Sequence, residues 1–216
     1  ESGWGWGALA EDLNNDGHRE LLTVEGQDFG GPEGADPTAS RGSDPLSQAL
    51  EYFASGSVRL WRGGPTQPLD EVSKSAGFTT NGLLKAVVAF DHDDDGDLDL
   101  VVTDTGSPPR FYRNETPEQG HWLHLTLGDD TTPNTHAIGA RVRLLDQAGE
   151  PAWLGEVRAG GGYQTSGPGT LHVGLGERSA VDSVEVRWPD SDEFKAYPIE
   201  GTDRAVDIVR TPTGPT

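Results

Sequence analysis

The sequence predicts an all-β protein in which two propeller-blade-like sheets, an incomplete propeller, are followed by a C-terminal β-sandwich. Gly (30) and Pro (15) are frequent among the 216 residues, and short apolar alternations recur between them, which favours short strands over helices. Two acidic loops occupy equivalent places in a repeated pattern. From about residue 121 onward, regular strand candidates alternate with turn residues, a pattern typical of a sandwich.

The first region, residues 1–120, contains an internal repeat. Each copy runs from a strand through an acidic loop to a second strand, and then to a strand that carries an aromatic residue and Arg. The strands are expected within residues 6–10, 21–24 and 58–64 in the first copy, and within 86–90, 100–103 and 109–114 in the second. Such units resemble propeller blades, and two of them cannot close a ring.

An insertion at about residues 25–56 separates elements of the first copy. It is rich in Gly, Asp, Pro and Ser, so most of it is expected to be loop. Within it, residues 44–53 predict a short helix, because Asp44 can serve as N-cap, Pro45 suits the first helical position, and apolar residues follow at helical spacing.

The second region, residues 121–210, is the predicted sandwich, and residues 211–216 are expected to be a frayed tail. Seven short strands are expected, at residues 122–127, 140–145, 153–158, 170–175, 183–188, 194–199 and 205–209.

The acidic loops at residues 12–20 and 91–99 place oxygen-bearing side chains at relative positions 1, 3, 5 and 9, with Gly at position 6. Clustered carboxylates repel one another, and Ca²⁺ takes about six to eight oxygen ligands at roughly 2.3–2.6 Å. The sequence therefore predicts two Ca²⁺ sites. The expected ligands are Asp12, Asn14, Asp16 and Glu20 with the carbonyl of His18, and Asp91, Asp93, Asp95 and Asp99 with the carbonyl of Asp97.

The plain alternative is that both loops are solvated turns, since Asp, Asn and Gly favour turns in any case. Two loops in register, each between strands, favour the metal. The flanking strands exclude an EF-hand, which needs helices and a Glu at position 12. Four carboxylates in the second loop against three in the first predict tighter binding at the second.

Composition limits the other functions. A net charge of −20 argues against binding to nucleic acid or to an anionic membrane surface. The absence of Cys excludes disulfides, thiolate zinc sites and a Cys nucleophile. There is no long apolar run for membrane insertion, and no export signal is visible in the given chain. Weak calcium loops suit an extracellular or periplasmic location, where calcium is abundant.

Other chemistries have weaker support. His121 and His124 are three apart on a predicted strand and face opposite sides, so they cannot share one zinc ion. No nucleophile elbow of the form Gly-x-Ser-x-Gly occurs, and we expect no enzymatic activity. An internal amide or ester cross-link remains an option for a Cys-free extracellular protein. Its candidate side chains are Lys85, Gln164 and Lys195.

Several motifs in a fixed order together resemble a known family. Residues 4–20 and 87–99 resemble the calcium-loop FG-GAP/VCBS repeats of integrin-type propellers, and residues 110–123 resemble the junction of the cartilage acidic protein family. Residues 137–142, 160–164, 171–176 and 181–189 are similar to its ASPIC/UnbV domain.

The resemblance implies a non-enzymatic extracellular interaction or adhesion module in which calcium is a structural ion, with an unidentified protein or glycan as partner. Glu20 in place of the more usual Asp, and the uncharged Asn14, depart from the repeat pattern. A glycan-binding module that uses exposed Trp residues or calcium is the alternative function.

Overall fold

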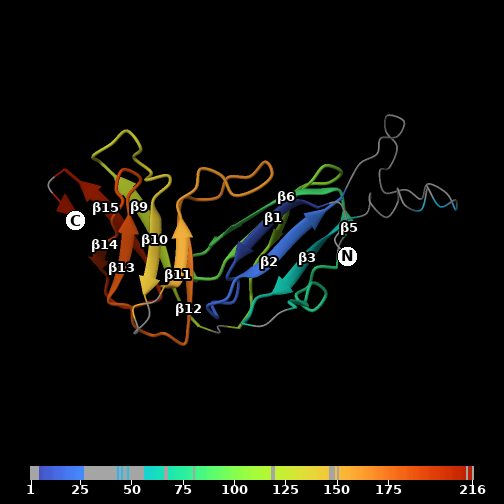
Figure 1. The fold of residues 1–216 in the computed structure, drawn as a ribbon. Helices are drawn as coiled ribbons and strands as arrows, with labels where there is room; N and C mark the ends of the chain where they lie inside the picture. The colour runs from blue at the N-terminus through green and yellow to red at the C-terminus, as the bar shows by residue number, and fades with distance from the viewer. Residues whose placement is uncertain are drawn as a thin grey trace.

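The fold is known from a computed structural model that describes residues 5–26, 43, 45, 48, 56–65, 68–79, 81–117, 120–145, 149, 151–212 and 214–215. Every element with defined bounds is a strand, and the strands form four sheets (Figure 1). In the first half the strands are β1 (Gly5–Glu11), β2 (Glu20–Glu25), β3 (Gly56–Arg62), β4 (Asp70–Glu71), β5 (Asn81–Gly82), β6 (Leu84–Phe90), β7 (Asp99–Asp104) and β8 (Arg110–Tyr112).

The first half consists of two antiparallel meanders. One sheet has the order β1-β2-β3-β4, with β5 also paired to β3, and the other has the order β6-β7-β8. The first acidic loop joins β1 to β2 and the second joins β6 to β7, so each loop lies between two antiparallel strands. Both sheets contribute to one apolar core, which includes Leu22, Val24, Leu84 and Val102, all without exposed surface.

The second half contains two four-stranded sheets around a second core. Its strands are β9 (His121–Asp129), β10 (Arg141–Leu145), β11 (Pro151–Glu156), β12 (Leu171–Gly176), β13 (Ser183–Arg187), β14 (Lys195–Pro198), β15 (Arg204–Thr211) and β16 (Gly214–Pro215). The sheet orders are β11-β10-β13-β14 and β12-β9-β15-β16, and β9 pairs with β15 in parallel. Alternating residues such as Val142 and Leu144, and Val184 and Val186, are buried in the shared core, as the period-two pattern requires.

The seven strands expected after residue 121 are all present, with ends that differ by a few residues. The tail was expected to fray from residue 211, but β15 extends to Thr211 and residues 214–215 form β16, which pairs with Arg210 and Thr211. The insertion joins the paired strands β2 and β3, and the helix expected at residues 44–53 falls almost wholly outside the described residues.

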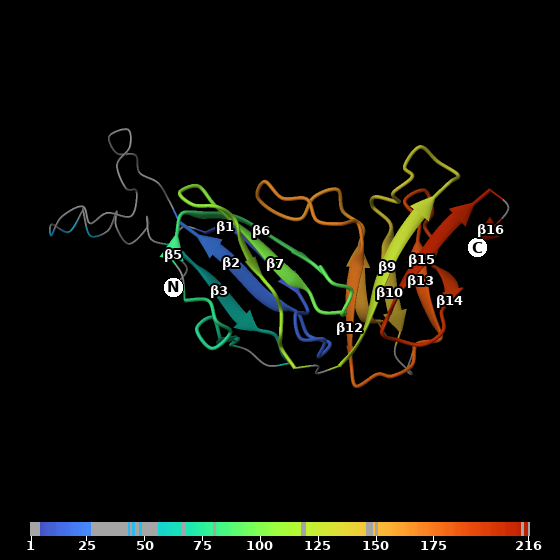
Figure 2. The ribbon, with the colours of Figure 1, turned by 180° about the vertical axis from the view of Figure 1, so that it is seen from behind.

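The two halves lie end to end, with the acidic loops beside β12 at their junction in both views (Figures 1 and 2). Within the part of the chain that the structure describes, no helix has the length and apolar character needed to span a bilayer.

Candidate functional site

Both acidic loops fold in the same way around the first Asp. The Asp12 carboxylate accepts the backbone N–H groups of Asp16 (3.2 Å) and Gly17 (2.8 Å). The Asp91 carboxylate accepts those of Asp95 and Gly96 at 3.3 and 2.8 Å. These bonds run to the same relative positions, 5 and 6, so the sequence repeat has produced a structural repeat.

Backbone conformation is repeated as well. Position 4 lies in the left-handed region in both loops, at Asn15 and Asp94 (both φ 59°), and position 6 is Gly17 (φ 88°) or Gly96 (φ 94°). Asn and Asp are the residues other than Gly that enter this region most readily, and Gly enters it at no steric cost. The sequence at positions 4 and 6 therefore allows the chain to turn back on itself around the carboxylates.

The carboxylate at position 9 closes each loop. Glu20 accepts the N–H of Leu13 (2.8 Å) and that of Gly63 in the segment after β3 (3.0 Å). Asp99 accepts the N–H of His92 at 3.0 Å and that of Asn114 at 2.7 Å. Glu20 and Asp99 therefore accept equivalent backbone hydrogen bonds in the two copies, so Glu can replace the more usual Asp in the first loop.

The second loop gathers its acidic side chains most closely. Asp91, Asp93 and Asp95 can each offer an oxygen that lies within 4.8 Å of the others, and a second such group joins His92 and Asp93 to Asp99. Opposed ligands of one Ca²⁺ ion lie about 5 Å apart, so this spacing fits the ion. His92 was not among the residues predicted from the sequence.

A guanidinium covers the same acidic group. Arg113 Nη2 lies 2.7 Å from Asp93 and 3.8 Å from Asp95, and the Arg113 side chain is 52% exposed. The ion pair can therefore yield to a competing divalent cation at little cost, because an exposed ion pair contributes only about 0–1 kcal/mol.

The first loop is more buried and carries fewer carboxylates. Asn14 Oδ1 accepts the Asp16 N–H at 3.2 Å, and its Nδ2 donates to Asp16 Oδ2 at 3.1 Å. Burial raises the pKa of Asp12 to about 6. The backbone hydrogen bonds from Gly17 and Asp16 act in the opposite direction, and repulsion from the carboxylates of Asp16 and Glu20 raises the pKa further. Burial also raises the pKa of Glu20. A cation would offset this negative charge, but among the described residues the carboxylates within 4.8 Å of one another that could hold an ion are those of the second loop.

The two residues predicted to supply carbonyl ligands differ in exposure. His18 is exposed, and its N–H donates to Asp16 at 2.8 Å. Asp97 is half-buried, and its Oδ1 accepts a hydrogen bond from Asn15 Nδ2 at 2.9 Å.

Asn15 joins the two loops to each other and to the second half of the chain. Its Nδ2 also donates to the Gly96 carbonyl (3.2 Å), its own carbonyl accepts the Gly176 N–H (2.9 Å), and only 2% of the residue is exposed. The sequence analysis did not single out Asn15. The only feature of the sequence that could have indicated a role for Asn15 was its place at position 4, between the predicted ligands at positions 3 and 5.

The loops pack directly against β9 and β12. A Cβ atom on Gly174 would lie 1.8 Å from Asp12 Oδ2, and one on Gly96 would lie 2.1 Å from the Trp122 ring. Asp91 Oδ2 lies 3.6 Å from His124 Nδ1. The candidate metal sites therefore lie at the junction of the two halves, with glycine providing the close approach.

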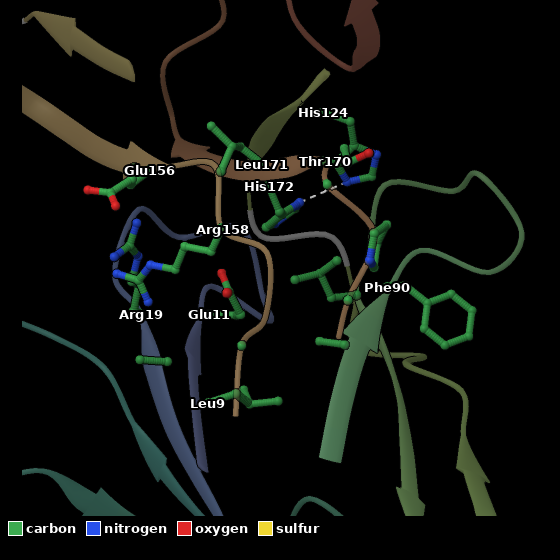
Figure 3. Close-up of a pocket in the computed structure, with 18 of the residues that line it drawn as sticks. Leu9, Glu11, Arg19, Phe90, His124, Glu156, Arg158, Thr170, Leu171 and His172 are labelled. Carbon is green, nitrogen blue, oxygen red and sulfur yellow. Dashed lines mark hydrogen bonds between the residues drawn. The ribbon is translucent and has the colours of Figure 1, made fainter. Parts of the chain in front are cut away.

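A cavity of about 940 Å³ opens beside the loops, between the two halves. Residues of β1 and β6 line one side, and residues of β10, β11 and the segment between β11 and β12 line the other. That segment reaches across to the first half, where Tyr163 contacts the Trp6 ring with centroids 5.0 Å apart. Figure 3 shows Arg19, Arg158, Glu11 and Glu156 on one side of this cavity.

Two histidines that line the cavity contact each other (Figure 3). His124 Nε2 lies 2.9 Å from His172 Nδ1, and burial lowers the pKa of both rings, that of His172 to about 3. His121 instead pairs with Asp203 at 2.7 Å. The expectation that His121 and His124 face different surroundings is confirmed, and the contact of His124 with His172 could not be inferred from the sequence.

The three cross-link candidates lie on separate elements. Lys85 on β6 donates to the Gly26 carbonyl (2.7 Å) and lies over the Trp6 ring at 4.2 Å. Lys195 on β14 lies 5.8 Å from the Tyr197 ring, and Gln164 has a positive φ of 52° in the segment before β12. The cross-link therefore stays a prediction.

The architecture defines an all-β protein with two acidic-loop meanders joined to a C-terminal pair of sheets. Residues 128–209 match the family model described as ASPIC and UnbV, which covers most of that C-terminal part. No curated protein matches the chain. One solved structure, described as a putative cell adhesion protein from Bacteroides fragilis NCTC 9343, is 14% identical over 97% of this chain and 79% of its own, with a TM-score of 0.19. That score is too low to define a shared fold.

Proposed function

We infer that this protein is a non-enzymatic, calcium-stabilised extracellular interaction module of the cartilage acidic protein type. The first half is proposed to be a pair of FG-GAP/VCBS repeats that form an incomplete propeller. The second is proposed to be an ASPIC/UnbV β-sandwich, on the support of the family match. An extracellular or periplasmic location belongs to the same proposal, since calcium is abundant there.

The observation that carries this proposal is the meeting of two like-folded acidic loops at the junction of the halves. Asn15 bonds the first loop to the second, and Gly174 and Gly176 bring β12 against the first. When bound, Ca²⁺ would supply positive charge to carboxylates that burial and mutual repulsion destabilise. The protein's own residues fix the loops and present the surface that surrounds the junction.

Calcium binding would contribute directly to folding stability, because the unfolded chain holds no such site. Asp12, Asn14, Asp16 and Glu20 would hold the first ion, and Asp91, Asp93, Asp95 and Asp99 the second. The carbonyls of His18 and Asp97 would complete the two sets.

Thermal unfolding in calcium and in EDTA tests the proposal, together with titration calorimetry to count the ions. With about 10 mM Ca²⁺ and Kd values of about 10⁻⁴–10⁻³ M, two sites stabilise the fold by about 3–5 kcal/mol. For a chain of this length, that corresponds to a rise in melting temperature on the order of 10 °C. An unchanged melt with no bound ion would refute it.

A further inference from the structure

The cavity between the halves gathers basic and acidic side chains. Its volume of about 940 Å³ lies within the range of small-ligand sites, which is roughly 300–1,000 Å³. Four carboxylates line it, those of Glu11, Asp91, Asp94 and Glu156, and so do five of the 16 basic side chains of a protein whose net charge is −20. The five basic side chains are those of Arg19, Arg141, Arg143, Arg158 and Arg187.

Two of these arginines have their own acidic partners. Arg141 pairs with Glu156 at 3.0 Å, and Arg143 pairs with Glu185 at 2.6 Å. Arg143 also lies 4.0 Å from the centroid of the Phe194 ring, so it is held on both sides. These two arginines are therefore already neutralised within the protein.

Arg19 and Arg158 are less fully compensated. Neither forms an ion pair with a residue that the structure describes, whereas Arg141 and Arg143 do. Both Arg19 and Arg158 are exposed, and Figure 3 shows them with Glu11 on the same side of the cavity. Two exposed guanidinium groups beside the half-buried Glu11 leave positive charge at this end of the cavity, and guanidinium binds a carboxylate in a bidentate manner.

An aromatic ring lies next to this cationic end. Arg19 Cζ is 5.6 Å from the centroid of the Trp153 ring, which also lines the cavity, and Arg19 Nη2 donates to the Leu154 carbonyl at 2.7 Å. Leu154, another lining residue, is 56% exposed. A sugar acid offers an apolar ring face together with a carboxylate, whereas an acidic peptide offers mainly carboxylates. Apolar and cationic groups side by side therefore favour the sugar.

We propose that this cavity binds an acidic oligosaccharide, with a uronate carboxylate held by Arg19 and Arg158 and the pyranose ring packed beside Trp153. The assignment rests on the interaction role proposed above and names a ligand class for it. It does not require calcium to touch the ligand, because the guanidinium groups belong to the protein itself.

The test uses the full chain in calcium and a labelled hyaluronan hexasaccharide, in which uronate alternates with N-acetylglucosamine. Neutral chitohexaose and hexaglutamate serve as the uncharged-sugar and acidic-peptide probes. Arg158→Gln is the test variant, since Arg158 is exposed and lies outside the strands. Arg62→Gln is the matched control, because Arg62 is exposed on β3 and does not line the cavity.

We expect hyaluronan hexasaccharide to bind more tightly than either other probe. Arg158→Gln is expected to weaken it about tenfold and Arg62→Gln to leave it unchanged, since a hydrogen bond to a charged group is worth about that factor or more. No hexasaccharide binding, equal binding of chitohexaose, tighter binding of hexaglutamate, or an unaffected Arg158→Gln variant would overturn the assignment. Melting curves of the same samples in calcium and EDTA report separately on the calcium proposal.

Discussion

Replacing Asp93 with Asn tests calcium binding at the second loop with little disturbance of the fold. The Asp93 side chain is 27% exposed, and its ion pair is with Arg113, which is itself half exposed. The hydrogen bonds that shape the loop are accepted by Asp91, Asp95 and Asp99. Asp93→Asn therefore removes one charged side chain from the proposed metal site and leaves those bonds in place.

The magnitude follows from linkage between binding and folding. At about 10 mM Ca²⁺, a site with a Kd of about 10⁻⁴–10⁻³ M stabilises the protein by about 1.4–2.7 kcal/mol. A tenfold weaker site loses about 1 kcal/mol of this, or about 2–4 °C in melting temperature for a chain of this size. In EDTA the loss of an exposed ion pair should change stability by less than about 1 kcal/mol.

Calorimetric melts in calcium and in EDTA give this difference directly. Asp94→Asn is the matched control, because it makes the same charge change in the same loop at a residue that is not a predicted ligand. Asn also tolerates the φ of 59° found there. The reasoning is refuted if Asp93→Asn keeps the whole calcium-dependent shift of the wild type, or if Asp94→Asn loses as much as Asp93→Asn.

Two further predictions concern buried polar groups. Asn15→Ala removes both side-chain hydrogen bonds between the acidic loops and places Ala at positive φ, so we expect a loss of about 2–3 kcal/mol in urea unfolding and weaker calcium binding at both sites by calorimetry. Independent, unchanged sites would contradict this. Arg210→Gln should cost about 3 kcal/mol at pH 7, because the 1%-exposed Asp129 loses its ionic partner. Arg210 holds the pKa of Asp129 well below its usual range, so this stabilisation is present above pH ~4 and is lost as the pH falls further. A cost that stays constant down to pH 2 would refute the pair's role.

The strands could be predicted largely because each needs one buried face. Val142 and Leu144 on β10, like Val184 and Val186 on β13, alternate with more exposed residues, and the period-two pattern is visible without any structure. The two-residue strands β4 and β5 lack such a pattern, since two residues cannot show a period. They form because the neighbouring strand β3 offers an edge with which to pair.

The acidic loops were predictable because their ligand spacing is local in the sequence. Their location was not, since it depends on contacts between distant segments. Gly174 of β12 contacts Asp12, and Trp122 of β9 contacts Gly96. The residues that flank either glycine in the sequence do not predict these contacts. The cavity is likewise formed from residues as far apart as Arg19 and Arg187, which no spacing rule connects.

Because the acidic loops lie at the junction of the two halves, their charge affects the contact between the halves as well as the loops themselves. Burial and neighbouring carboxylates raise the pKa of Asp12, so without a cation the loop is destabilised where it meets Gly174 of β12. A cation that relieves this repulsion would stabilise the contact between the halves as well as the loop.

The cavity is lined from both halves, so a ligand held there also favours their contact. Two ligands that favour one arrangement must strengthen each other's binding by the same factor. Calcium affinity measured with and without the hexasaccharide should therefore change by the same ratio as hexasaccharide affinity measured with and without calcium.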